Sequence, residues 1–156
     1  MYIQNVKGWI TMIDNRFGSR PVAPSKPMVK KPPLDSRTYV KQAENVILEL
    51  DKNKNDSPDL STSQLRNIHT MITELYNMVS HYDGETLSDE ILSHIQYTKM
   101  KIAYNAGRDK KVKDFVLRAQ LMDYLDSADN KSALLLVCHY SEALVAYHRF
   151  YRKEND

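Results

Sequence analysis

Apolar residues recur at steps of three and four over most of the chain after Leu34. The clearest stripe lies between Leu65 and Tyr82 and consists of Leu65, Ile68, Ile72, Leu75, Val79 and Tyr82. Such steps place side chains on one face of an α-helix. The pattern therefore predicts a core helix here. Ser61 and Gln64 have the spacing of a capping box at its start.

The same periodicity predicts four further helices, over about 34–50, 86–106, 110–126 and 131–152. We expect Asp35 or Ser36 to cap the first, and Asp129 or Asn130 to cap the last. The helix over 110–126 carries apolar residues on two sides, so it should lie centrally or be shared with a second subunit.

The helix over 86–106 has the clearest predicted ends. Thr86 and Asp89 have the spacing of a second capping box. Leu92 is expected on its inward side, together with Ile91, Ile95, Ile102 and Ala106. Gly107 is expected in the left-handed position after the helix, and Asp109 is expected to cap the helix that follows.

These helices and the short loops between them predict an all-α protein, a compact bundle of about five helices. Glycine is scarce, at 4 of 156 residues, and five of the six prolines precede Leu34. We therefore expect one helical domain over 34–156 and a basic, proline-rich extension over 1–33. The extension suggests a mobile or partner-docking arm. An export or transit signal is disfavoured because a continuous apolar core is missing, and Met12 and Met28 are alternative starts.

Charge is segregated along the chain. The stretch 95–118 holds seven basic residues against two acidic ones, a balance of +5, whereas 42–96 holds three against ten, a balance of −7. The net charge of the whole chain is only +2. Segregation of this kind indicates a surface for an anionic partner.

The basic stretch also has a geometry that suits nucleic acid. Tyr97, Lys101, Tyr104 and Arg108 are spaced four, three and four, which places them on one helix face. Alternating aromatic and cationic side chains suit a nucleic-acid backbone with unstacked bases. Lysines in the first turn after Asp109 are unfavourable unless an anion lies there. The charge pattern nominates Lys99, Lys101, Tyr104, Lys110, Lys111 and Lys113 as contacts.

The alternative is that the tyrosines edge the core and the lysines form a solvated face. The sequence supports no catalytic, metal or cofactor site. No two histidines have i, i+4 spacing, and Cys138 is the single cysteine, expected to be a buried, inert thiol. Asp123, Asp126 and Asp129 suit a divalent ion or, preferably, a solvated helix end. A single cysteine and no long apolar run predict a cytoplasmic protein without a membrane span.

Three segments together resemble a known family. They are 62–68 (TSQLRNI), 104–108 (YNAGR) and 142–148 (EALVAYH), and they resemble the small α-helical subunit of the type III-A CRISPR Csm effector complex over about 35–151. The resemblance implies a non-catalytic bacterial or archaeal protein of antiviral defence. It also implies basic RNA-facing residues, which fall here on Arg66 and Arg108.

The implied partners are crRNA and target RNA, further copies of the chain, the backbone subunit that cleaves RNA, and the large polymerase and nuclease subunit. Two alternatives from other classes stay open. One is a protein–protein adaptor whose lysines meet an acidic partner. The other is a small helical enzyme that uses the cluster between Asp123 and Asp129.

Overall fold

The computed structural model describes residues 30–153, which form six α-helices and no β-strand. The chain divides into two units, Met1–Lys30 and Lys31–Asp156, of which the second contains all of these helices. They are α2 (Tyr39–Glu49), α3 (Thr62–Ser80), α4 (Asp89–Arg108), α5 (Lys110–Ala119), α6 (Leu121–Ser127) and α7 (Lys131–Tyr151). The all-α prediction is confirmed. The expected extension over 1–33 lies outside the described residues except for its last four.

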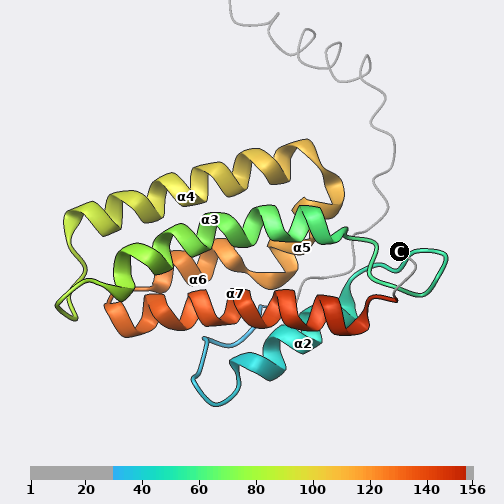
Figure 1. The fold of residues 1–156 in the computed structure, drawn as a ribbon, viewed down its shortest axis with the longest axis horizontal. Helices are drawn as coiled ribbons and strands as arrows, with labels where there is room; N and C mark the ends of the chain where they lie inside the picture. Colours follow the sequence, from blue (N-terminus) through green and yellow to red (C-terminus); the bar gives the residue numbers. More distant parts are fainter. Residues whose placement is uncertain (1–29, 154–156) are drawn as a thin grey trace, which may run out of the picture. The chain divides into compact units, whose positions relative to one another are not determined.

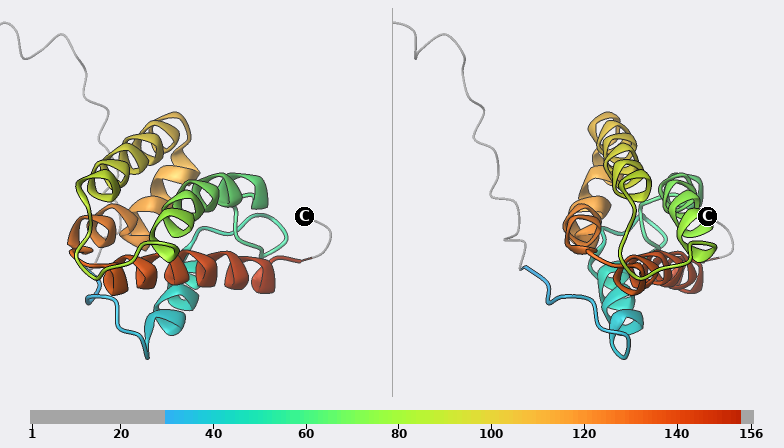
Figure 2. Two further views of the ribbon diagram at one scale, coloured as in Figure 1. Left: turned by 60° about the vertical axis from the view of Figure 1, so that its left-hand side comes forward. Right: turned by 90° about the vertical axis from the view of Figure 1, so that its left-hand side faces the viewer.

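Four helical segments alternate in direction along the bundle. The chain runs out along α3, returns along α4, runs out again through α5 and α6, and returns along α7 (Figure 1). Helix α7 packs against α2, α3 and α6, and α2 crosses its outer side (Figure 2). Helix α7, the most apolar helix, is thus covered on several sides, which buries its apolar residues.

The buried side chains form one apolar cluster to which every helix contributes. On α3 the predicted stripe is buried from Leu65 to Val79, and Tyr82, just past the helix, is half-buried. The capping box is confirmed: Ser61 Oγ accepts from the Gln64 N–H, and Gln64 Oε1 accepts from the Ser61 N–H. The side-chain cap of α7 is Asn130, the second of the two predicted candidates.

The predicted caps of two helices are wrong. Helix α2 begins only after Thr38, because the Asp35 carboxylate accepts the Arg37 N–H in a preceding turn. Helix α4 is capped by Ser88, whose Oγ accepts from the Ile91 N–H, so the second capping box at Thr86 does not form. In both places a residue nearer the helix has taken the cap position.

Two predictions about the body of α4 are also wrong. Leu92 is exposed, because the inward face follows Ile91 and Ile95, and Leu92 lies about 100° away from Ile91. Gly107 is helical and does not take the left-handed conformation. The helix continues to Arg108 and ends where Asp109 adopts an extended backbone, with its side chain already committed to capping α5.

The helix predicted over 110–126 is two helices. Gln120 has a left-handed backbone, with φ of 50°, and separates α5 from α6. The break frees the Ala119 carbonyl, which accepts a hydrogen bond from the buried Tyr140 hydroxyl at 3.0 Å. The bend also allows Leu121 and Tyr124 to enter the core, while Leu117 stays exposed. Two apolar sides on one predicted helix are therefore explained by a change of direction.

Residues 31–33 lie against the bundle, inside the predicted extension. The Lys31 ammonium pairs with Glu49 at 3.0 Å, and the Pro32 carbonyl accepts from the Tyr124 hydroxyl at 2.8 Å. A weaker contact at 3.4 Å joins the Gln42 amide to the Pro33 carbonyl. These contacts join the last three residues of the predicted extension to the helical bundle.

Candidate nucleic-acid interface

The starts of α3 and α5 meet the end of α4 in a polar junction. The Gln64 amide donates to the Asp109 carboxylate at 2.5 Å, and the Asn67 amide donates to Asn105 Oδ1 at 2.9 Å. Asn105 in turn donates to the Lys101 carbonyl within α4. Two of the segments that carry the family resemblance, 62–68 and 104–108, are therefore in direct contact.

Asp109 holds the first turn of α5, as predicted. Its Oδ1 accepts from the backbone N–H groups of Lys111 and Val112. The hydrogen bond from Val112 is the main cause of a lowered pKa for the Asp109 carboxyl, so the residue is ionised at neutral pH. Because a carboxylate already occupies this helix start, an incoming phosphate would meet the lysine side chains and not the helix backbone.

The predicted stripe on α4 forms as a row of ring and cation. The Lys101 ammonium lies 5.0 Å from the centre of the Tyr97 ring, and the Arg108 guanidinium lies 5.4 Å from that of Tyr104. The two tyrosines are 51% and 64% exposed, respectively. They do not edge the core, which removes one half of the alternative interpretation.

Three of the predicted basic contacts are engaged in ion pairs. Lys99 pairs with Asp126 of α6. Lys101 pairs with Glu74 of α3 at 2.5 Å. Lys99 and Lys101 therefore lie on opposite sides of α4, because residues two apart on a helix point about 200° apart. Lys111 pairs with Asp59 at 2.9 Å.

The remaining cations are open to a partner. Arg66, Arg108, Lys110 and Lys113 are exposed, and within residues 30–153 none of them forms an ion pair. Arg66 is adjacent to Asn67, and Arg108 follows Asn105 by one helical turn. Because Asn67 and Asn105 are in contact, the two arginines lie at the same end of the α3–α4 pair.

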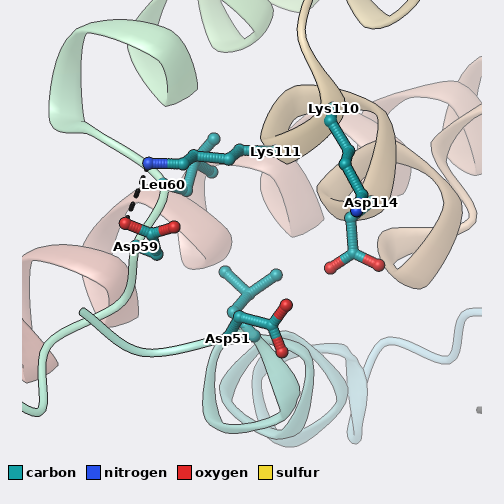
Figure 3. A pocket seen from close by; sticks show the side chains of 7 residues that line it. Asp51, Asp59, Leu60, Lys110, Lys111 and Asp114 are labelled. Atoms are coloured by element: carbon teal, nitrogen blue, oxygen red, sulfur yellow. Dashed lines mark hydrogen bonds and ion pairs between the residues drawn. The ribbon is translucent and has the colours of Figure 1, made fainter.

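Two hollows flank the start of α5. One, of about 330 Å³, is lined by Leu50, Asp51, Asp59, Leu60, Lys110, Lys111 and Asp114. Figure 3 shows the Lys111 ammonium at the Asp59 carboxylate, with Asp51 and Asp114 facing the same space. Three carboxylates against two lysines make this hollow unsuited to an anion, so Lys110 can meet a phosphate only outside it. The other hollow, of about 230 Å³, is lined by Gln64, Asn67, Ile68, Asn105, Arg108, Asp109 and Val112.

Sequence reasoning did not identify the amides of Gln64, Asn67 and Asn105. The sequence predicts only a capping role for Gln64, and nothing in the periodicity pairs two asparagines that lie 38 residues apart. The sequence feature that points to these amides is their position inside the segments that resemble the family, where the resemblance implies RNA contact only for the arginines.

The structure gives no support to a metal site at Asp123, Asp126 and Asp129 or to a reactive cysteine. Asp126 is paired with Lys99, and Asp129 accepts from Asn130, so the three predicted aspartates are not assembled. Between residues 30 and 153, no three His, Cys, Asp or Glu side chains come together as metal ligands. Cys138 is buried, and burial raises the pKa of its thiol to about 12. Over the same residues, no helix has the length and apolarity needed to cross a membrane.

Comparison with known proteins gives a consistent answer. The family described as Csm2 Type III-A matches residues 34–154. The chain is 34% identical over 118 residues to the "CRISPR system Cms protein Csm2" of Streptococcus thermophilus, covering 76% of this chain and 94% of that protein. The protein of the same name from Mycobacterium tuberculosis is 37% identical over 113 residues, covering 72% and 90%. That of Enterococcus italicus is 38% identical over 96 residues, covering 60% and 69%. These matches confirm the resemblance, and the chain belongs to the Csm2 family of type III-A CRISPR systems.

Proposed function

We propose that this chain is a non-catalytic structural subunit of a type III-A Csm ribonucleoprotein, in which it contacts the backbones of crRNA and target RNA. The observation that carries the RNA contact is the set of exposed cations without an ion pair in the described residues, namely Arg66, Arg108, Lys110 and Lys113. Unpaired, solvated cations bind phosphates without first losing an internal partner.

Lys101 and Lys111 have a secondary part in this proposal. Lys101 is held by Glu74 and Lys111 by Asp59, so a phosphate would have to compete with a carboxylate for either of them. Tyr104 adds an exposed ring on which a base can stack. Lys99 faces α6, and we assign it the weakest contribution of the eight predicted contacts.

Assembly with other subunits requires surfaces of another kind. Phe150 on α7 is 75% exposed, and Val40 and Leu48 on α2 are also exposed. Exposed apolar side chains mark a protein contact where they form a contiguous patch. We propose that further copies of the chain and the neighbouring Csm subunits cover such residues.

RNA contact is tested by the salt dependence of binding. For single strands, the slope of log affinity against log salt is about −0.7 per phosphate neutralised. If Arg108, Lys110 and Lys113 each neutralise one phosphate, replacing all three with Ala should flatten the slope by about 2. The matched control replaces Arg37, Lys54 and Arg149, three exposed basic residues from other parts of the bundle.

The control variant should keep the slope of the unaltered chain, although it loses the same charge. If both variants change the salt slope equally, only the net charge of the protein matters, and the RNA contact cannot be assigned to Arg108, Lys110 and Lys113. Tight, salt-sensitive binding of acidic peptides in place of RNA would favour the adaptor function. Co-purification from the native host, with sequencing of bound RNA, tests membership of the complex independently.

A further inference from the structure

The smaller hollow beside α5 is lined by apolar side chains, here called its floor, and by polar side chains, here called its rim. Ile68 and Val112, both buried core residues, form the floor. The amides of Gln64, Asn67 and Asn105 and the guanidinium of Arg108 form the rim. A flat ring with hydrogen-bonding edges matches this combination, because its face can lie on the floor and its edge can meet the rim.

The rim keeps unused hydrogen-bonding groups. Asn67 donates one hydrogen to Asn105, and its Oδ1 and second N–H have no partner within the described part of the chain. The Arg108 guanidinium contacts the Tyr104 ring but makes no hydrogen bond or ion pair to any residue from 30 to 153. The rim therefore offers the Asn67 acceptor, one N–H left unused by the described residues on each of Gln64, Asn67 and Asn105, and a planar fork of five donors.

The Asp109 carboxylate decides what kind of group can enter. It lines the same hollow, and its negative charge opposes a phosphate. A neutral polar ring suffers no such repulsion. The volume of about 230 Å³ is below the roughly 300–1,000 Å³ of ordinary small-molecule sites, which favours one ring of a larger ligand held outside.

We propose that this hollow receives one unstacked nucleobase of the RNA strand whose backbone lies on Arg66, Arg108, Lys110 and Lys113. The inference rests on the RNA contact proposed above and adds a ligand class to it. Purines fit best, because an asparagine amide matches the N6 and N7 edge of adenine, and the remaining ring nitrogens of an unstacked adenine can accept hydrogen bonds from the Arg108 fork. The subunit would then hold the phosphates without regard to sequence and favour a purine at one position.

The test uses single-stranded RNA 12-mers with equal numbers of phosphates: oligoadenylate, oligouridylate and an abasic strand. Their affinities for the full chain are measured by fluorescence anisotropy over a range of salt. We expect oligoadenylate to bind at least about fivefold more tightly than the abasic strand, since a good base contact contributes about a factor of five or more. All three strands should share one salt slope.

Two variants locate the effect. Asn67→Ala removes the amide from the rim, and Arg108→Lys keeps the charge but removes the planar fork. Each should bring the ratio of oligoadenylate to abasic affinity towards one while the salt slope is retained. Asn77→Ala, on the same helix but away from the hollow, is the matched control and should keep the ratio. If Asn67→Ala lowers the melting temperature because Asn105 loses its hydrogen-bond donor, the result for Arg108→Lys alone decides the test.

The outcomes separate the two proposals. Equal affinity for the base-bearing and abasic strands, with a normal salt slope, overturns the nucleobase site and leaves the backbone contact standing. An adenylate preference that both variants keep places base binding elsewhere and also overturns the site. Absence of salt-dependent binding to any strand overturns both the site and the RNA contact.

Discussion

The Gln64 amide donates to the Asp109 carboxylate at 2.5 Å and thereby joins the first turn of α3 to the residue that caps α5. The same amide accepts the Ser61 N–H, so one side chain serves two helix starts. The two helices that carry Arg66 and Lys110 are fixed to one another by this contact. Its geometry needs an uncharged donor at Gln64 and an ionised acceptor at Asp109.

Gln64→Glu should therefore destabilise the protein at neutral pH. The glutamate can still accept the Ser61 N–H, but it places a second carboxylate against Asp109, and two close carboxylates repel and raise one pKa. The drop in melting temperature should be larger at pH 8 than at pH 4, where one of the pair is protonated. A pH-independent difference between variant and parent would show that lost packing, not charge, is responsible.

Tyr140→Phe should cost about 1–3 kcal/mol of unfolding free energy, because it leaves the buried Ala119 carbonyl without a donor. Urea titration measures the change. Tyr82→Phe is the control. The Tyr82 hydroxyl donates to the carbonyl of the exposed residue Thr86, and water can replace that donor in the variant. Equal losses in the two variants would contradict the assigned role of Tyr140 at the helix break.

Acidification should destabilise the fold through His148. This residue is 1% exposed and donates from Nε2 to the Leu60 carbonyl at 2.7 Å, and burial lowers its pKa. The unfolded chain takes up a proton near the ordinary pKa of about 6.5, whereas the folded chain resists it. The contribution to stability is full above that pH and is lost as the pH falls. His69, whose pKa is also lowered by burial, acts in the same direction.

Urea titrations at pH 7.5, 6.5 and 5.5 check this dependence. His148→Gln should be less stable at pH 7.5 but show a shallower decline between the three values. His81→Gln changes an exposed histidine and should decline like the parent. A parent protein with the same stability at all three pH values would contradict the prediction.

Truncation should locate the start of the folded unit. Removing residues 1–29 should leave the melting temperature unchanged, because the contacts of Lys31, Pro32 and Pro33 are kept. Removing residues 1–33 should lower it, since Tyr124 loses its acceptor and Glu49 its cation. Equal melting temperatures for the two truncations would show that these contacts contribute nothing measurable.

Periodicity identified the helices because each buries one face against a shared core. It failed where a single residue changed the path. Nothing in the sequence around Gln120 marks a left-handed backbone, and Tyr140, which donates to the Ala119 carbonyl at the break, belongs to another helix. Leu92 was assigned inward because apolar residues are usually buried, although the α4 face is fixed by Ile91 and Ile95.

The basic charge of the candidate site could be predicted from the sequence, but its ion pairs could not. Lys110, Lys113 and the tyrosine–cation row follow from composition and helical spacing. Which lysines are neutralised does not, because Glu74, Asp59 and Asp126 reach them from distant parts of the sequence. The amide rim of the smaller hollow depends on the same kind of long-range contact.

Burial makes the Cys138 thiol unreactive. The thiolate is the reactive form, and a pKa of about 12 leaves almost no thiolate at pH 7. Maleimide chemistry can therefore be directed to one introduced cysteine without first removing the natural one. Ser93, exposed on α4, accepts such a change without loss of a core contact. A dye at that position would report on the α4 surface inside an assembled complex, with the folded chain otherwise unaltered.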